Sequence, residues 1–91
     1  MELLDEASVT ARLARLRWDR DGDAIVRVVD RGDFAGSLAF VDAVGALAEA
    51  RNHHPDIAIS WATVTLTLTT HSAGGLTQAD LDLAAAIDEL D

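Results

Sequence analysis

The fold of this chain is decided by residues 56–70, which read DIAISWATVTLTLTT. Apolar side chains alternate at Ile57, Ile59 and Trp61 and again, in the opposite phase, from residue 64 to residue 68, which is the period of a half-buried strand. The phase slips at Ala62-Thr63. Because a one-residue slip would move every later side chain to the other face of a strand, it marks a turn between two strands or a bulge within one. We prefer the turn, which predicts a β-hairpin whose second arm directs three side chains to the core: Val64, Leu66 and Leu68.

The segment before this hairpin predicts a long helix. Asp33 is a good N-cap, because its side chain can accept a hydrogen bond from a backbone N–H of the first turn. Helical spacing continues as far as Arg51, and Pro55 bounds the helix, since the residue before a proline is pushed away from helical angles. The apolar set of this helix is Phe34, Leu38, Val41, Val44, Leu47 and Ala48.

Two further elements are predicted nearer the N-terminus. Apolar residues at helical spacing indicate a first helix from Asp5 to Leu16, with Asp5 or Ser8 as its N-cap. A turn signal at residues 21–23, followed by a β-branched run at residues 24–29, predicts a hairpin over Trp18–Asp30 with Trp18 on its first arm.

A last helix is predicted after Gly74-Gly75, with Thr77 as its N-cap. Its apolar residues are Leu81, Leu83, Ala84, Ile87 and Leu90. The order of elements is then α-β-β-α-β-β-α. This order predicts an α+β fold, in which three helices pack on one face of a four-stranded antiparallel sheet.

Composition limits the classes of function. A chain of 91 residues is long enough for one core and too short for two, so residues 1–91 are expected to form a single domain. The formal net charge of −9 argues against direct nucleic-acid binding, which needs clustered Lys and Arg. The same acidity disfavours an anionic membrane surface, and no apolar run approaches the ~20 residues of a membrane span. The N-terminus does not read as a secretory signal, so we expect a cytoplasmic protein.

The candidate chemistry rests on the chain's three histidines, His53, His54 and His71. His53 and His54 lie where the second helix gives way to an extended segment, and His71 lies at a strand end, away from the core face. Imidazole titrates near ~6.5, so two such groups can act as an acid and a base at neutral pH. Glu49, four residues before His53, shares its helical face and can accept a hydrogen bond from an imidazole.

The residues by themselves leave other interpretations open. Taken by themselves, the histidines favour a polar helix end and a solvated strand end over a catalytic role, and Glu49 can be a solvated carboxylate. A zinc site is the main competitor, because three histidines and a carboxylate match its usual ligand count. Adjacent histidines point in different directions, however, and no second ligand stands at the i, i+4 spacing, so we expect no metal. Neither Ser60 nor Ser72 lies in a nucleophile-elbow pattern, and there is no cysteine.

Three segments carry a family resemblance. Residues 49–56 (EARNHHPD), the strand ending Thr69-Thr70-His71 and residues 75–80 (GLTQAD) together resemble the signature of the pterin-4a-carbinolamine dehydratases, also known as the dimerisation cofactor family. The spacing between His54 and His71 fits the family pattern. Similarity covers nearly the whole chain, including Trp18, Asp33-Phe34 and Phe40.

The resemblance implies a reaction that uses neither a metal nor an organic cofactor. Family members dehydrate 4a-hydroxytetrahydropterin, the product left by aromatic amino acid hydroxylases, to quinonoid dihydropterin, and so support tetrahydrobiopterin recycling. Carried over residue by residue, the catalytic set is His53, His54 and His71. In this set His53 and His71 are the acid–base candidates, while His54 helps to hold and orient the pterin. The residues that would orient the imidazoles are Glu49 and Asp80. Those that would line the pocket beside the histidines are Pro55, Thr70, Ser72 and Ala73.

The resemblance also implies partners and an alternative function. Many relatives carry an aromatic residue two positions after the proline, where this chain has Ile57, with Trp61 four residues further on. Relatives form dimers or tetramers, so a homodimer or homotetramer is expected. Relatives in animals stabilise dimers of a transcription factor, and others assist the assembly of other proteins. The alternative to a dehydratase is therefore a non-enzymatic binding or assembly module.

Overall fold

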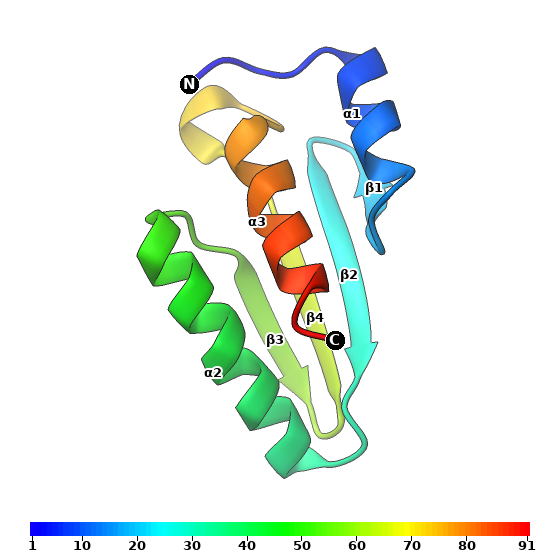
Figure 1. The fold of residues 1–91 in the computed structure, drawn as a ribbon, viewed down its shortest axis with the longest axis vertical. Coiled ribbons are helices and arrows are strands. Elements are labelled where there is room, and N and C mark those ends of the chain that lie inside the picture. The colour runs from blue at the N-terminus through cyan, green and yellow to red at the C-terminus, as the bar shows by residue number, and fades with distance from the viewer.

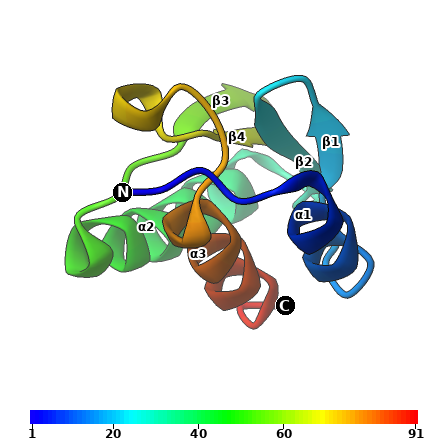
Figure 2. The ribbon, with the colours of Figure 1, turned by 90° about the horizontal axis from the view of Figure 1, so that it is seen from above.

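A four-stranded antiparallel sheet in the order β1-β2-β4-β3 forms one layer of the structure, a computed structural model that describes residues 1–91. The strands are β1 (Asp19–Asp21), β2 (Ala24–Asp30), β3 (Asp56–Ser60) and β4 (Thr63–Leu68). The helices are α1 (Glu6–Leu13), α2 (Phe34–Arg51) and α3 (Gln78–Asp88), and a short 3-10 helix, η1 (His71–Ala73), lies between β4 and α3. All three α-helices lie on one face of the sheet (Figures 1 and 2), which confirms the predicted α+β architecture. None of them is long and apolar enough to cross a membrane.

The predicted turn between the last two strands is confirmed. Ser60 pairs with Thr63 across it, so the turn consists of Trp61 and Ala62 alone. Trp61 has a positive φ of 48° and is 69% exposed, so its predicted place in the strand alternation was wrong. The hydroxyl of Ser37 donates to the Trp61 carbonyl over 2.6 Å and ties this turn to the first turns of α2.

The core lies between the sheet and the helices, and β4 is its centre. Val64, Leu66 and Leu68 are all fully buried, as the alternation predicts. They belong to a cluster of 15 buried apolar residues that also draws on β2, α2 and α3. Burying each such side chain contributes about 1.5–3 kcal/mol. The central strand therefore fixes which face of the sheet the helices cover.

The core face of α2 was predicted in part: Val44 and Ala48 are buried and Val41 and Leu47 pack against the core, but Phe34 and Leu38 do not. Its buried residues are Ser37, Phe40, Val44 and Ala48, whereas Phe34 and Leu38 are 49% and 44% exposed. The helix carries apolar residues on more than one stripe, so helical spacing alone does not say which stripe meets the sheet. Ser37 belongs to the buried stripe because its hydroxyl bonds the β3–β4 turn.

The N-terminal elements are shorter than predicted. Asp5, and not Ser8, is the N-cap of α1, since its carboxylate accepts from the Ser8 N–H over 2.7 Å. The helix ends at Leu13, because the N–H of Leu16 bonds the Leu13 carbonyl in a tighter turn. Trp18 precedes β1 instead of belonging to it, and it is buried.

A cluster of ion pairs joins the C-terminal end of α3 to β2. Arg27, which is 7% exposed, bonds both Asp88 and Asp91 from the core side of the sheet. Asp91 also forms ion pairs with Arg17 at 2.9 Å and with Arg31 at 3.1 Å. Burial acts to raise the pKa of Asp91, but the hydrogen bond from Arg27 and the three positive charges outweigh it and hold that pKa below its ordinary value of 3.8.

This cluster predicts how stability depends on pH. A carboxyl group whose pKa is lower in the folded than in the unfolded chain stabilises the fold above its unfolded pKa, and loses that contribution as pH falls through its folded pKa. Asp91→Asn should therefore lower the free energy of unfolding at neutral pH. Urea unfolding of the variant and the parent should converge as the pH falls below about 4. Parallel curves down to acid pH would show that Asp91 does not carry this linkage.

Candidate active site

The end of α2 positions His53 and His54. Asn52 adopts a left-handed conformation with φ 50°, which asparagine tolerates better than most residues. The N–H of His53 reaches back to the Ala48 carbonyl over 3.1 Å, and that of Asn52 to the Glu49 carbonyl over 3.3 Å. This pattern is a Schellman motif, and it satisfies carbonyls that the helix end leaves free. The backbone of His53 is thus part of the helix cap.

A small closed loop carries His71. The N–H of Thr70 donates to the Gly75 carbonyl over 2.9 Å, and that of Gly75 to the Thr70 carbonyl over 3.3 Å. Residues 71–73 form the single turn of η1 inside this loop, and Gly74 closes it with φ 79°. The loop is therefore held at its base while His71 and Ser72 remain exposed. The prediction that β4 runs on to His71 was wrong, since β4 ends at Leu68.

These two segments meet in one cleft of about 300 Å³. The residues that line it are Asn52, His53, His54, Thr69, Thr70, His71 and Ser72. All three histidines, the only ones in the chain, lie in it although 17 residue numbers separate His54 from His71. Two hollows of similar size flank the cleft: one of about 310 Å³ shares Thr69 and His71 with it, and another of about 350 Å³ shares His53.

His53 is held from behind by a buried carboxylate. Its Nε2 lies 2.6 Å from Oδ1 of Asp80, which is fully buried at the start of α3. The other oxygen of Asp80 accepts from the Thr70 hydroxyl at 2.7 Å and from the Thr77 N–H at 2.9 Å. The His53 side chain keeps 15% of its surface exposed, and Nδ1 makes no hydrogen bond within the chain. One ring nitrogen is thus anchored while the other is free for a ligand.

The partner predicted for Glu49 needs correction. Glu49 bonds Nε2 of His54, not His53, with the two side chains 78% and 55% exposed. The helical face that Glu49 was expected to share with His53 ends at Arg51, because the left-handed Asn52 turns the chain and His54, not His53, then lies against Glu49. Each carboxylate therefore holds a different imidazole: Asp80 that of His53 and Glu49 that of His54.

The sequence-based prediction missed some residues that line the cleft and included others that do not line it. Asn52 and Thr69 line the cleft but were not expected there, and Thr77 was expected only as a helix cap. The alternation of residues 63–69 does place Thr69 on the face away from the core, which was a usable signal. Pro55 and Ala73 were expected in the pocket and are not among its lining residues.

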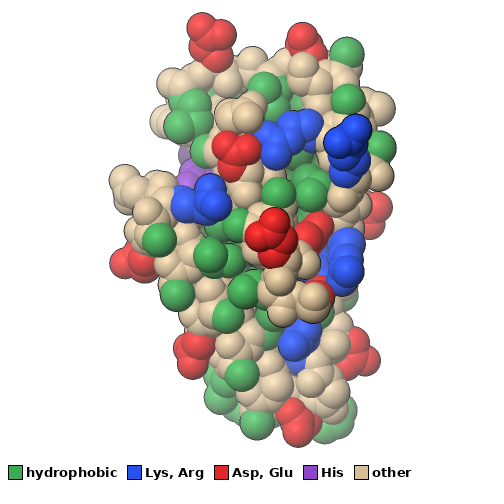
Figure 3. Space-filling view, viewed as in Figure 1, with side chains coloured by type: hydrophobic (Ala, Val, Ile, Leu, Met, Phe, Trp, Pro, Cys, Tyr) green, Lys and Arg blue, Asp and Glu red, His purple; other side chains and the backbone are tan.

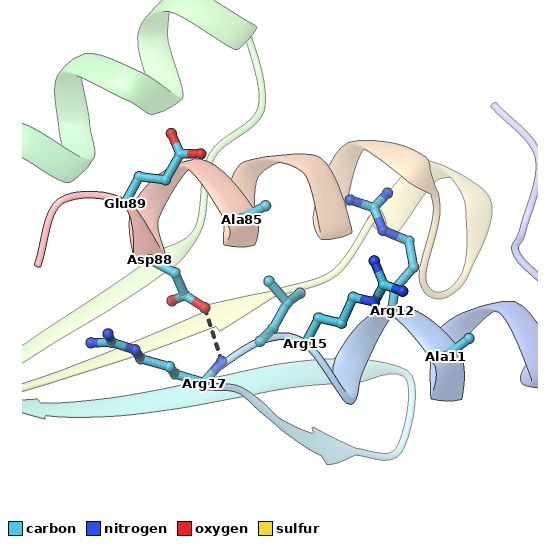
Figure 4. Close-up of a pocket in the computed structure, with 8 residues that line it drawn as sticks. Ala11, Arg12, Arg15, Arg17, Ala85, Asp88 and Glu89 are labelled. Atoms are coloured by element: carbon cyan, nitrogen blue, oxygen red, sulfur yellow. Dashed lines mark hydrogen bonds between the residues drawn. The ribbon is translucent and has the colours of Figure 1, made fainter.

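The largest hollow of the surface lies elsewhere. It measures about 660 Å³ and opens between α1 and α3, and it is lined by Arg12, Arg15 and Arg17 from the α1 side and by Asp88 and Glu89 from α3 (Figure 4). Arg12 and Arg17 are already paired with Asp82 and Asp91, and the Arg17 N–H bonds Asp88. Size alone therefore does not identify the reactive site, since this hollow contains no histidine. Figure 3 shows histidine only at the margin of the face that carries this hollow.

Fold and cleft together define a class: a small α+β protein that presents three histidines at the joined ends of a helix and a strand, with carboxylates behind two of them. No group of three His, Asp or Glu side chains has the arrangement of metal ligands. A family model of pterin 4 alpha carbinolamine dehydratases matches residues 2–90. A Nocardia farcinica protein named "Putative pterin-4-alpha-carbinolamine dehydratase" is 52% identical over 90 residues, covering 98% of this chain and 95% of its own. This chain belongs to the pterin-4-alpha-carbinolamine dehydratase family.

Two solved structures share the fold. The "transcriptional coactivator/pterin dehydratase" of Brucella melitensis superposes with a TM-score of 0.91 at 28% identity, over 97% of each chain. A pterin dehydratase-like protein described as a RuBisCO assembly factor in the alpha-carboxysome superposes with a TM-score of 0.65 at 29% identity. That alignment covers 82% of this chain and 87% of the other. The family resemblance expected from residues 49–56, 69–71 and 75–80 is confirmed.

The site geometry predicts unequal reactivity of the three imidazoles. His54 and His71 are exposed, whereas His53 is largely covered and has one nitrogen committed to Asp80. Diethyl pyrocarbonate should therefore modify two histidines quickly and the third much more slowly. Peptide mass mapping over time should identify the slow one as His53. Fast modification of His53 in the folded protein would contradict the limited exposure of its ring.

Proposed function

We propose that this protein dehydrates 4a-hydroxytetrahydropterins to quinonoid dihydropterins by general acid–base catalysis with histidine. The observation that carries the proposal is the meeting of His53, His54 and His71 in a single cleft, in a chain that has no other histidine. Membership of the family supplies the substrate class.

The reaction makes a simple demand on the site. The hydroxyl on C4a must leave as water, so its oxygen needs a proton, and the proton on N5 must be removed as the C4a–N5 double bond forms. One acid and one base suffice, and the same two groups can return to their starting states by exchange with water. Imidazoles suit both tasks near neutral pH, since their ordinary pKa lies near ~6.5.

The way each ring is held supports the roles that the family resemblance implies. His53 and His71 share the two proton transfers, because they lie in the cleft with Nδ1 of His53 and the whole His71 ring free of hydrogen bonds within the chain. His54 binds and orients the pterin, with Nε2 of its exposed ring paired with Glu49. A cleft of about 300 Å³, extended by the hollows beside His53 and His71, is at the lower end of the range for small-molecule sites.

A second function, protein binding, is favoured by a separate part of the surface. Phe34 and Leu38 are exposed apolar residues four positions apart on α2. The exposed Trp61 lies near them, because its carbonyl accepts a hydrogen bond from Ser37, which precedes Leu38. Figure 3 shows hydrophobic side chains gathered at the end where α2 begins. Such a patch fits a second copy of the chain in a homodimer or homotetramer, or an assembly client like that of the RuBisCO assembly factor. It lies at the opposite end of α2 from the histidines, so the two functions can be separated by mutation.

Stopped-flow dehydration of enzymatically generated 4a-hydroxytetrahydropterin tests the proposal. The protein should accelerate the reaction, and His53→Ala and His71→Ala should each lower kcat/KM by roughly 10²- to 10⁴-fold, the usual contribution of a positioned acid or base. Thr65→Val is the matched control, because Thr65 lies on the open face of the sheet, outside the cleft.

Two results would count against this function. If the unmodified protein gave no acceleration, the protein-binding role would become the better account of the chain. If the protein were active but both histidine variants retained full turnover, the acid–base assignment would be wrong even though the substrate was right.

A further inference from the structure

We infer that Thr70 and Thr77 are positioning residues, which fix the Asp80 carboxylate and through it the ring of His53. The consequence for the reaction rests on the proposed function, in which His53 transfers a proton. The contacts themselves do not depend on it. Thr70 was expected only to line the pocket and Thr77 only to cap a helix.

The contacts of Asp80 determine which group donates in each of its hydrogen bonds. Three groups approach its two oxygens: His53 Nε2 at 2.6 Å, the Thr70 hydroxyl at 2.7 Å and the Thr77 N–H at 2.9 Å. An ionised carboxylate only accepts, and all three contacts are satisfied if each partner donates. His53 must then carry its proton on Nε2, which leaves Nδ1 as the atom that faces a ligand.

The directions of the hydrogen bonds between the two threonine hydroxyls follow from those of Asp80. Because the Thr70 hydroxyl donates to Asp80, its oxygen is free to accept from the Thr77 hydroxyl, 2.9 Å away. The sulfur of Met1 lies at the same distance from the Thr77 oxygen, but sulfur is the weaker acceptor. A chain of donors therefore runs from Thr77 through Thr70 to Asp80. Hydrogen bonds linked in this way strengthen one another where water is excluded.

Burial makes this series of hydrogen bonds rigid. Thr77 and Asp80 are fully buried and Thr70 is 7% exposed, so no water replaces a lost partner easily. The backbone of Thr70 is pinned by its paired bonds with Gly75, and Thr77 and Asp80 form the capping box of α3. Without the Thr70 hydroxyl, Oδ2 of Asp80 keeps only one donor and the carboxylate gains freedom to rotate. The His53 ring would then be held by a partner that moves.

The test compares Thr70→Val, which keeps the shape and removes the hydroxyl, with Thr70→Ser, which keeps the hydroxyl. Thr65→Val, on the open face of the sheet, is the control. The first measurement is the ring Nε2–H proton of His53 by NMR in water, assigned by its absence in His53→Ala. The parent, Thr70→Ser and Thr65→Val should all show a slowly exchanging N–H signal, and Thr70→Val should lose it through fast exchange.

The second measurement is dehydration kinetics. Thr70→Val should lower kcat by about 10- to 100-fold, which corresponds to one hydrogen bond to a charged group, with KM little changed. Thr70→Ser should restore most of it. If Thr70→Val does not fold, as judged by circular dichroism, Thr70→Ala carries the same comparison.

The two measurements separate this inference from the proposed function. If the parent shows the protected N–H but no dehydratase activity, the positioning network stands and the enzymatic role fails. If the folded parent shows no protected His53 N–H, or if Thr70→Val keeps both the signal and full kcat, the network does not position His53 and the inference is overturned.

Discussion

The buried carboxylate of Asp80 is the interaction on which the rest of this structure depends. It accepts the N–H of Thr77 at the first turn of α3, the hydroxyl of Thr70 at the end of the strand region and the ring of His53 just beyond α2. Three segments that are separate in the sequence are thereby fixed to one side chain. A fully buried charge is costly unless each of its oxygens is well bonded, and both oxygens of Asp80 are. The start of α3 and the back of the cleft are therefore held by the same side chain.

The cleft combines a rigid back with an exposed front. His53 is capped into α2 through its backbone and fixed through its ring, whereas His54 and His71 project from a helix end and a small closed loop. This arrangement suits acid–base chemistry on a planar substrate, because one ring keeps a set orientation while the others adjust to the ligand. The ion pairs of Arg27 with Asp88 and Asp91 support the opposite end of α3, so that helix is held at both termini. The exposed apolar residues near the start of α2 form the separate surface for which we propose a partner or a second copy.

Much of this fold was predictable, because the alternation at residues 64–68 reports burial directly. The hairpin, the three helices and their order all follow from period and capping signals, and so does the capping role of Asp33 and Thr77. The core stripe of α2 was predictable only in part: Val44 and Ala48 are buried as expected, whereas Phe34 and Leu38 are exposed because the helix is apolar on more than one side. The pairing of Glu49 with His54 was missed for a local reason: a left-handed residue at 52 breaks the helical spacing on which the prediction relied. The hydrogen bonds that Asp80 makes with His53 and Thr70 join separate segments, and no spacing rule in a single sequence predicts them.

The central claim, that one buried carboxylate organises both the fold and the site, is tested most directly by Asp80→Asn. An amide at this position keeps the shape but cannot accept all three donors, so the free energy of unfolding should fall by roughly 2–3 kcal/mol and the His53 ring N–H should exchange freely. Asp82→Asn, on the same helix, breaks a part-exposed ion pair with Arg12 and should change stability by less than about 1 kcal/mol and leave the ring signal intact. Urea unfolding and NMR of both variants give the answer. If Asp80→Asn were as stable as the parent and its His53 ring equally protected, the organising role of Asp80 would be contradicted.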